Sequence, residues 1–179
     1  KMQTDLISTD QPDVIELALK ILQAGGLVAF PTDTVYGLGA LAFNGKAVES
    51  IYAAKNRPVE KAIPILLANL DDLPKVTSTL PVLANKLASR FWPGPLTLVV
   101  PKNPNLPASV SATNTVAVRV LNHAVASALL HMTGPMAVTS ANISGQPSPI
   151  TAEEVFAQLS GRINLIINGG KTPGGAPST

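Results

Sequence analysis

Residues 27–39 read LVAFPTDTVYGLG. The first four form a short apolar run that predicts a buried strand, and the proline that follows breaks it. The rest of the segment carries hydroxyl groups, the carboxylate of Asp33 and two glycines, Gly37 and Gly39, which would let the main chain approach a ligand. Taken alone, the segment is better explained as an ordinary polar turn, because loops favour such residues. Whether this segment binds a ligand therefore has to be decided from the rest of the chain.

Helical and strand-like patterns alternate on both sides of this strand, with no linker between them. Predicted helices cover residues 12–24, 44–57, 81–92 and 122–131, and a capping box at 151–154 begins another; predicted strands cover 27–30, 63–67, 96–100, 115–120, 136–139 and 165–167. This alternation predicts a single α/β domain over residues 1–179. Short connections favour a mixed sheet, but the sequence does not reveal the order of its strands.

Composition narrows the class of protein. Of the 179 residues, 46% are hydrophobic and 13% are charged, a balance that excludes a disordered tail. Cysteine is absent, which excludes disulfides, thiolate metal ligands and a cysteine nucleophile. No apolar run approaches the ~20 residues that span a bilayer, and the polar N-terminus is unlike a signal peptide, so we expect a soluble, cytoplasmic protein without membrane contact. The net charge of +2 is scattered, so an anion must be recognised by a few converging side chains.

The first candidates for such recognition lie where the second predicted helix ends. Lys55 and Arg57 precede Pro58, which pushes Arg57 into an extended conformation, and Lys61 follows closely. Three cations within seven residues favour an anion site. A cation that complements the dipole at the end of a helix explains them equally well.

A lone arginine shares a predicted strand with core residues. In TVAVRV at 115–120, three valines alternate with Thr115, Ala117 and Arg119. If the valines face the core, Arg119 and its small neighbours form the other face, as the floor of a cleft would. An exposed strand face with a solvated arginine is the equal alternative.

The predicted strand 136–139 leads into a polar loop, and residues 138–148 read VTSANISGQPS. Ser140 and Asn142 lie two residues apart, just beyond the strand, and Ser148 follows in the same loop. Ligands of α/β sheets bind beyond the carboxyl ends of strands, where hydroxyl and amide groups can hold phosphate or carboxylate oxygens. A simple turn has a similar composition.

Taken together, PTDTVYGLGA, KNRP, FWPGPLTLVV, TVAVRV and TSANISG resemble, in this order, the YrdC-like family of threonylcarbamoyl-adenylate synthases, from about Ile15 to the C-terminus. The resemblance implies a twisted open α/β sheet around a concave, positively charged cavity. It also implies a nucleotidyltransferase that joins L-threonine, bicarbonate and ATP into L-threonylcarbamoyl-AMP and releases pyrophosphate, for the N6-threonylcarbamoyladenosine modification of tRNA. Proteins that transfer the threonylcarbamoyl group to tRNA would be its downstream partners.

The same resemblance implies roles for individual residues. Catalysis would fall to Lys55, Arg57, Ser140 and Asn142. L-Threonine would be held by Thr34, Arg57, Arg119 and Val138. ATP would be held by Lys55, Lys61, Thr115, Ser140, Asn142 and Ser148. Mg²⁺ would bridge the phosphate oxygens of ATP, mostly through water and substrate rather than through a protein metal site.

The chain departs from the family pattern in two places. Many relatives carry asparagine where Lys61 stands and histidine where Leu66 stands, so this wall of the threonine pocket differs. The chain also stops inside a motif that usually continues into another strand. We therefore expect a truncated C-terminus, without the additional C-terminal domain of longer relatives.

Two other functions compete with this one. A non-catalytic module of the same fold could bind double-stranded RNA or tRNA, weakly, in ribosome or tRNA maturation. The low charge counts against it, because affinity for a phosphate backbone comes from many cations. The other is the carbamoyl-transfer domain of hydrogenase-maturation proteins, whose zinc-finger-like and acylphosphatase-like parts do not occur in this chain.

Overall fold

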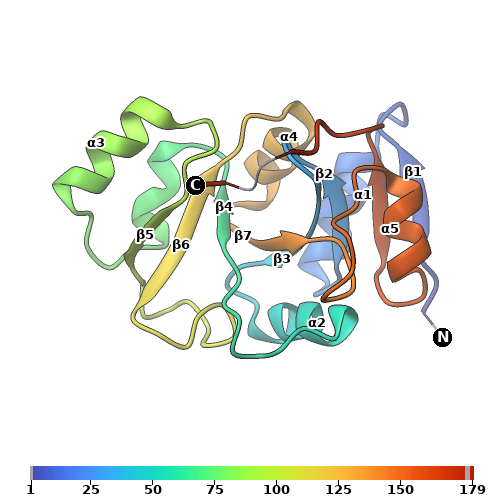
Figure 1. Cartoon of the computed structure of the whole chain (residues 1–179), viewed down its shortest axis with the longest axis horizontal. Helices are drawn as coiled ribbons and strands as arrows, with labels where there is room; N and C mark the ends of the chain where they lie inside the picture. The colour runs from blue at the N-terminus through green and yellow to red at the C-terminus, as the bar shows by residue number, and fades with distance from the viewer. Residues whose placement is uncertain (1, 176–177) are drawn as a thin grey trace.

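The structure is a computed structural model that describes residues 2–175 and 178–179; residues 1, 176 and 177 of the predicted domain lie outside the described residues. Within the described part, eight strands form one sheet in the order β1-β8-β2-β3-β7-β4-β6-β5 (Figure 1). The strands are β1 (Asp5–Ser8), β2 (Val28–Pro31), β3 (Tyr36–Leu41), β4 (Ile65–Leu67), β5 (Leu98–Pro101), β6 (Thr115–Val120), β7 (Met136–Ser140) and β8 (Leu165–Asn168).

The sheet is mixed, as the short connections predict. β8 runs parallel to β1 and β2, and β4 runs parallel to β6. β3, β7 and β5 lie antiparallel to their neighbours. A single α/β domain with a mixed sheet is therefore confirmed for the described residues.

Helices cover both faces of this sheet. They are α1 (Val14–Gln23), α2 (Gly45–Lys55), the 3-10 helix η1 (Leu70–Lys75), α3 (Val82–Phe91), α4 (Ala124–Thr133) and α5 (Ala152–Leu159). Buried side chains of α1 and α4 share one core, and those of α2, α3 and α5 share the other. On the α1/α4 face the helices pack mainly on β2, β3 and β8.

Local signals explain where two of the helices begin. Asn44 caps α2 by accepting a hydrogen bond from the Ala47 N–H at 3.1 Å. Thr151 caps α5 by accepting from the Glu154 N–H at 3.2 Å, and the Glu154 carboxylate accepts from the Ile150 N–H at 2.7 Å. Both caps agree with the prediction.

The prediction missed β1, η1 and β3. The sequence of β3 predicts a polar turn instead of a strand, because Gly37 and Gly39 are more typical of turns than of strands. In the structure a Cβ at Gly37 would lie 2.7 Å from Val138 Cγ1, and one at Gly39 would lie 2.7 Å from Met136 Cε. These glycines therefore leave room for side chains of the neighbouring strand β7. Gly37 also lines the cavity described below, so the approach of its main chain to a ligand stays a prediction.

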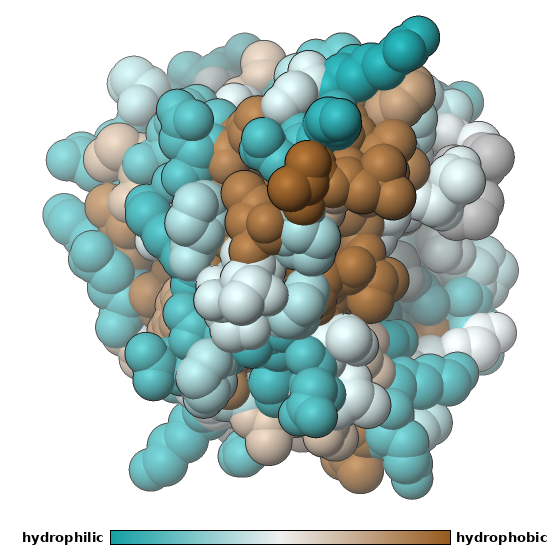
Figure 2. Space-filling model, turned by 90° about the vertical axis from the view of Figure 1, so that its left-hand side faces the viewer, coloured by the Kyte–Doolittle hydropathy of each residue, from teal (hydrophilic) through white to brown (hydrophobic). Residues whose placement is uncertain are grey.

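Apolar side chains gather on the surface at the α3 and β5 end of the molecule (Figure 2). The exposed members are Leu80, Val82, Leu83, Phe91 and Val99. They lie apart from the site described below, because none of them lines its cavity. Among the described residues, no helix has both the length and the apolar character needed to cross a membrane.

Candidate functional site

A cavity of about 550 Å³ opens on the α1/α4 face, over β3, β7, β4 and β6. Its lining includes six residues that the resemblance selects: Thr34, Arg57, Arg119, Val138, Ser140 and Ser148. These residues belong to the β2–β3 turn, the segment after α2, the strands β6 and β7, and the loop after β7. The fold thus brings distant segments together around two guanidinium groups, and the predicted basic cavity is present.

Arg119 is the buried cation of this cavity. The valines of β6 enter the core on the other side, as the alternation predicts, and the parallel register sets Arg119 beside Leu66 of β4. Its side chain is only 8% exposed and forms an ion pair through Nη2 with the carboxylate of Asp33. Nε donates to the Gly94 carbonyl at 2.9 Å. The guanidinium is therefore paired and held in place, as a buried charge must be.

Arg57 is the second cation that lines the cavity, and it is half-buried. Asn56 ends α2 in the left-handed conformation, with φ of 52°, and so turns the chain away from the helix axis. Arg57 Nη2 then donates to the Ala62 carbonyl at 2.8 Å, and Nε donates to the Lys61 carbonyl at 3.3 Å. Burial lowers the pKa of Arg57, but a guanidinium remains protonated in proteins. The cavity therefore keeps this positive charge.

Lys61 supports Arg57 through its main chain rather than through its ammonium group. Its carbonyl accepts hydrogen bonds from Arg57 and from the Tyr52 hydroxyl, the latter at 3.0 Å. The Lys61 side chain is exposed and does not line the cavity. Contact between Lys61 and ATP stays a prediction.

Lys55 lies behind the cavity wall and is 1% exposed. Its ammonium group donates to the main-chain carbonyl of Ser140, and lies 3.4 Å from Ser140 Oγ and 3.5 Å from Thr139 Oγ1. Burial, and to a lesser degree the charge of Arg57, lowers the pKa of Lys55 from 10.5 to about 8. Lys55 thus holds the end of β7, whose Thr139 and Ser140 line the cavity.

Asn142 shapes the loop that follows β7. It is buried, and Nδ2 donates to the carbonyls of Ile143 at 3.0 Å and Gln146 at 2.9 Å. Asn142 Oδ1 has no hydrogen-bond partner among the described residues. Asn142 does not line the cavity, whereas Ser148, in the same loop, does. The contact of Asn142 with ATP stays a prediction.

Thr115 stands apart from the cavity. It begins β6, four residues before Arg119, so the two are ~13 Å apart along the strand. Thr115 is exposed, and its hydroxyl lies 3.2 Å from that of Thr113. The role predicted for it in nucleotide binding stays a prediction.

Sequence reasoning missed three polar contributors to the site. Asp33 was noted as a carboxylate, but its pairing with Arg119 was not foreseen. Thr97 and Ser178 also line the cavity, and their hydroxyl oxygens lie 2.7 Å apart. A single carboxylate beside the polar turn, in a chain with so few charges, was the available signal for Asp33. No local pattern marks Thr97 or Ser178.

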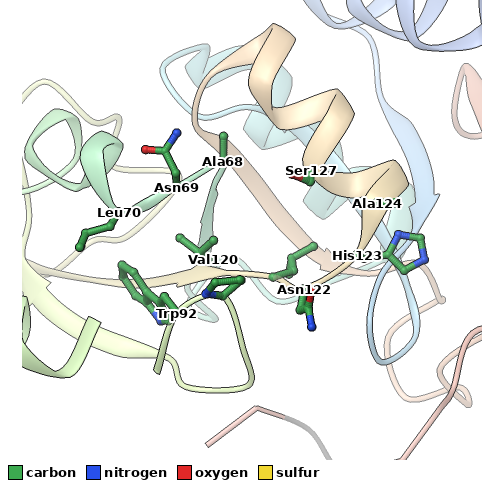
Figure 3. Close-up of a pocket in the computed structure, with 11 residues that line it drawn as sticks. Ala68, Asn69, Leu70, Trp92, Val120, Asn122, His123, Ala124 and Ser127 are labelled. Atoms are coloured by element: carbon green, nitrogen blue, oxygen red, sulfur yellow. The ribbon is translucent and has the colours of Figure 1, made fainter. Parts of the chain in front are cut away.

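A second depression, of about 440 Å³, lies near the N-terminus of α4 (Figure 3). Trp92, Leu70 and Val120 form its apolar part, and its lining includes no lysine or arginine. The His123 ring points away from it in Figure 3, and His123 Nδ1 accepts a 3.5 Å hydrogen bond from the Ala126 N–H. The cations and hydroxyls therefore identify the larger cavity as the site.

Comparison with known proteins agrees with this geometry. The family model named Sua5_yciO_yrdC, described as "Telomere recombination", matches residues 20–179. The chain belongs to the Sua5/YciO/YrdC family. This membership confirms the resemblance and the fold that it implies.

Two curated members of the Sua5/YciO/YrdC family are named threonylcarbamoyl-AMP synthase. The chain is 44% identical to the protein of Bacillus subtilis, over 98% of this chain and 51% of the relative, and 45% identical to that of Pyrococcus abyssi, over 92% and 49%. The structure of P. abyssi Sua5 complexed with L-threonine superposes with a TM-score of 0.92 at 42% identity, covering 98% of this chain and 53% of that one. The chain thus spans about half the length of these relatives.

Proposed function

We propose that this chain forms L-threonylcarbamoyl-AMP and pyrophosphate from L-threonine, bicarbonate and ATP. The observation that carries the proposal is the convergence of Arg57, Arg119, Thr34 and Ser140 on one cavity. The names of the relatives support the reaction, and the L-threonine complex of P. abyssi Sua5 supports an amino-acid pocket. The cavity volume lies within the usual range of small-molecule sites.

The chemistry requires two anions to meet. The threonine amine attacks bicarbonate carbon to give a carbamate, with loss of water. A carbamate oxygen then attacks the α-phosphorus of ATP, and the bond to the leaving pyrophosphate breaks. Carbamate and triphosphate repel each other, so fixed cations that neutralise both supply most of the catalysis. Arg57 is placed for this role, Arg119 is placed to bind the carboxylate of threonine, and no covalent nucleophile is needed.

Hydroxyl groups would orient the substrates between these cations. Thr34 lies in the β2–β3 turn, where its N–H donates to the Thr32 hydroxyl at 3.2 Å. Ser140 of β7 pairs with Gly37 of β3, and both Thr34 and Ser140 line the cavity. Ordered turns and strands hold both side chains before substrate arrives, which favours reaction by positioning.

Mg²⁺ would enter with ATP. Among the described residues no group of three or more His, Cys, Asp or Glu side chains is arranged to hold a metal ion. Asp33, the carboxylate beside the cavity, is bonded to Arg119 and to the Asn122 N–H. These residues fit an ion whose ligands come mainly from phosphate and water, and the ion would neutralise charge on the phosphates.

The product is a reactive mixed anhydride. A cytoplasmic protein that transfers its threonylcarbamoyl group to tRNA would be the next partner in the reaction sequence. Such a partner would protect the anhydride from hydrolysis.

Pyrophosphate release tests the proposal. We expect release with L-threonine, bicarbonate and Mg-ATP, much less with L-serine, and none without an amino acid. Absence of threonine-dependent pyrophosphate release would refute the proposed enzymatic activity. Strong, steeply salt-dependent RNA binding without turnover would favour the RNA-binding module instead.

A further inference from the structure

Asp33 is engaged at both oxygens although it does not line the cavity. One oxygen pairs with Arg119 Nη2. The other accepts a hydrogen bond from the Asn122 N–H at 3.1 Å. The carboxylate therefore ties the β2–β3 turn to the end of β6. The Asp33 side chain is 18% exposed, so little water competes for it.

These contacts leave one nitrogen of the Arg119 guanidinium free to bind a ligand. Nε is bonded to Gly94 and Nη2 to Asp33, whereas Nη1 has no hydrogen-bond partner within the described part of the chain. A guanidinium is planar, so holding two of its nitrogens fixes the direction of the third. Arg119 lines the cavity, and Nη1 is the nitrogen it can offer there.

We propose that Asp33 is a positioning residue for the carboxylate of the amino-acid substrate. It acts through Arg119: the ion pair sets the plane of the guanidinium, and Nη1 then binds the carboxylate. The inference rests on the proposed function, because it takes an α-amino acid as the ligand of this cavity.

The ion pair also determines the electrostatics around Arg119. Without Asp33, a guanidinium with only 8% of its side chain exposed would lose its partner. A buried cation in that state turns toward other acceptors or draws in water. Its direction would then no longer suit the substrate.

The experiment is a cycle of two protein forms and two ligands. Asp33→Asn removes the charge at nearly constant size, and L-threoninol replaces the carboxylate of L-threonine by a hydroxymethyl group. Binding of each ligand to wild type and variant is measured by calorimetry. We expect Asp33→Asn to weaken L-threonine binding by about tenfold, the usual size of a lost charged hydrogen bond. Binding of L-threoninol should change less than about twofold, because its neutral hydroxymethyl group forms no charged pair with Arg119 Nη1.

Two further variants make the result interpretable. Asp72→Asn breaks the ion pair of Asp72 with Lys75, 2.8 Å long, on η1, and should leave both affinities unchanged. Asp33→Glu keeps the charge but displaces the guanidinium, so it should repeat the selective loss if Asp33→Asn fails to fold.

An equal loss for both ligands would make Asp33 a purely structural residue and overturn the inference. Unchanged or tighter binding of L-threonine would overturn it too. Pyrophosphate release by the wild type is measured in parallel. Turnover together with an unselective effect of Asp33→Asn would leave the proposed function standing and remove this inference alone. A wild type that neither turns over nor binds L-threonine would remove both.

Discussion

Lys55 and Ser140 are joined by a hydrogen bond from the buried ammonium group of the lysine to the main-chain carbonyl of the serine. The Lys55 carbonyl also accepts from the Ser144 N–H at 2.8 Å. The end of α2 is therefore fastened to the end of β7 and to its loop. Lys55 is thus linked to the cavity through Thr139 and Ser140, which line it, and its direct contact with ATP stays a prediction.

The lowered pKa of Lys55 predicts a pH dependence of stability. The folded pKa is about 8 and the ordinary value is 10.5, so between these values the unfolded chain binds more protons. Unfolding then takes up a proton, and the contribution of Lys55 to the free energy of unfolding rises with pH from about 8 to about 10.5. Denaturant unfolding of wild type and Lys55→Met across this range measures the difference. Lys46→Met, on the exposed side of α2, is the control. A difference that stays constant with pH would contradict the burial of the charge.

Lys55→Ala should also abolish threonine-dependent pyrophosphate release, because the β7 end loses its anchor. Circular dichroism checks that the fold remains. Normal turnover in a folded variant would remove Lys55 from the mechanism.

Arg57→Ala should reduce threonine-dependent pyrophosphate release by at least ~100-fold, since it removes a preorganised cation from the reacting anions. The far-UV spectrum should stay unchanged, because the lost contacts are with the Lys61 and Ala62 carbonyls at the edge of the site. Arg90→Ala, on the exposed side of α3, should retain full activity. Equal rates for the two variants would show that Arg57 takes no part.

Arg119→Ala should chiefly raise the KM for L-threonine. The substrate carboxylate loses Nη1, whereas ATP loses no direct contact. Initial rates with each substrate varied in turn measure the two KM values. An unchanged KM for L-threonine would place the arginine outside the amino-acid pocket.

Gly37→Ala should destabilise the protein by about 1–3 kcal/mol, the usual cost of overpacking. Its Cβ would lie 2.7 Å from Val138 Cγ1, on a strand that cannot easily move. Urea unfolding of the variant measures this cost. Gly45→Ala, where the nearest atom is Pro107 Cβ at 3.3 Å, is the matched substitution and should cost less. If Gly37→Ala had the same free energy of unfolding as the wild type, β7 would have to shift at little cost to make room for the new Cβ.

Most helices and strands could be predicted from local signals. The valine alternation of β6 and the caps Asn44 and Thr151 rest on neighbours within four residues, so sequence spacing suffices to find them. β3 could not be predicted in this way. Its glycines are accommodated by Val138 and Met136, which lie far along the chain.

The sequence by itself determined the chemical inventory: a chain with few charges, no cysteine, and cations and hydroxyls at the ends of strands. Together with the family resemblance, it also marked six of the residues that line the cavity. Only the tertiary structure decided which of these groups line the cavity and which bond to other parts of the chain. In the structure the Lys55 ammonium is bonded to the end of β7, the Lys61 side chain is exposed, and Arg119 forms an ion pair with Asp33. The reason is physical: a buried charge must find a partner, and the partner is supplied by whichever distant segment the sheet order brings beside it.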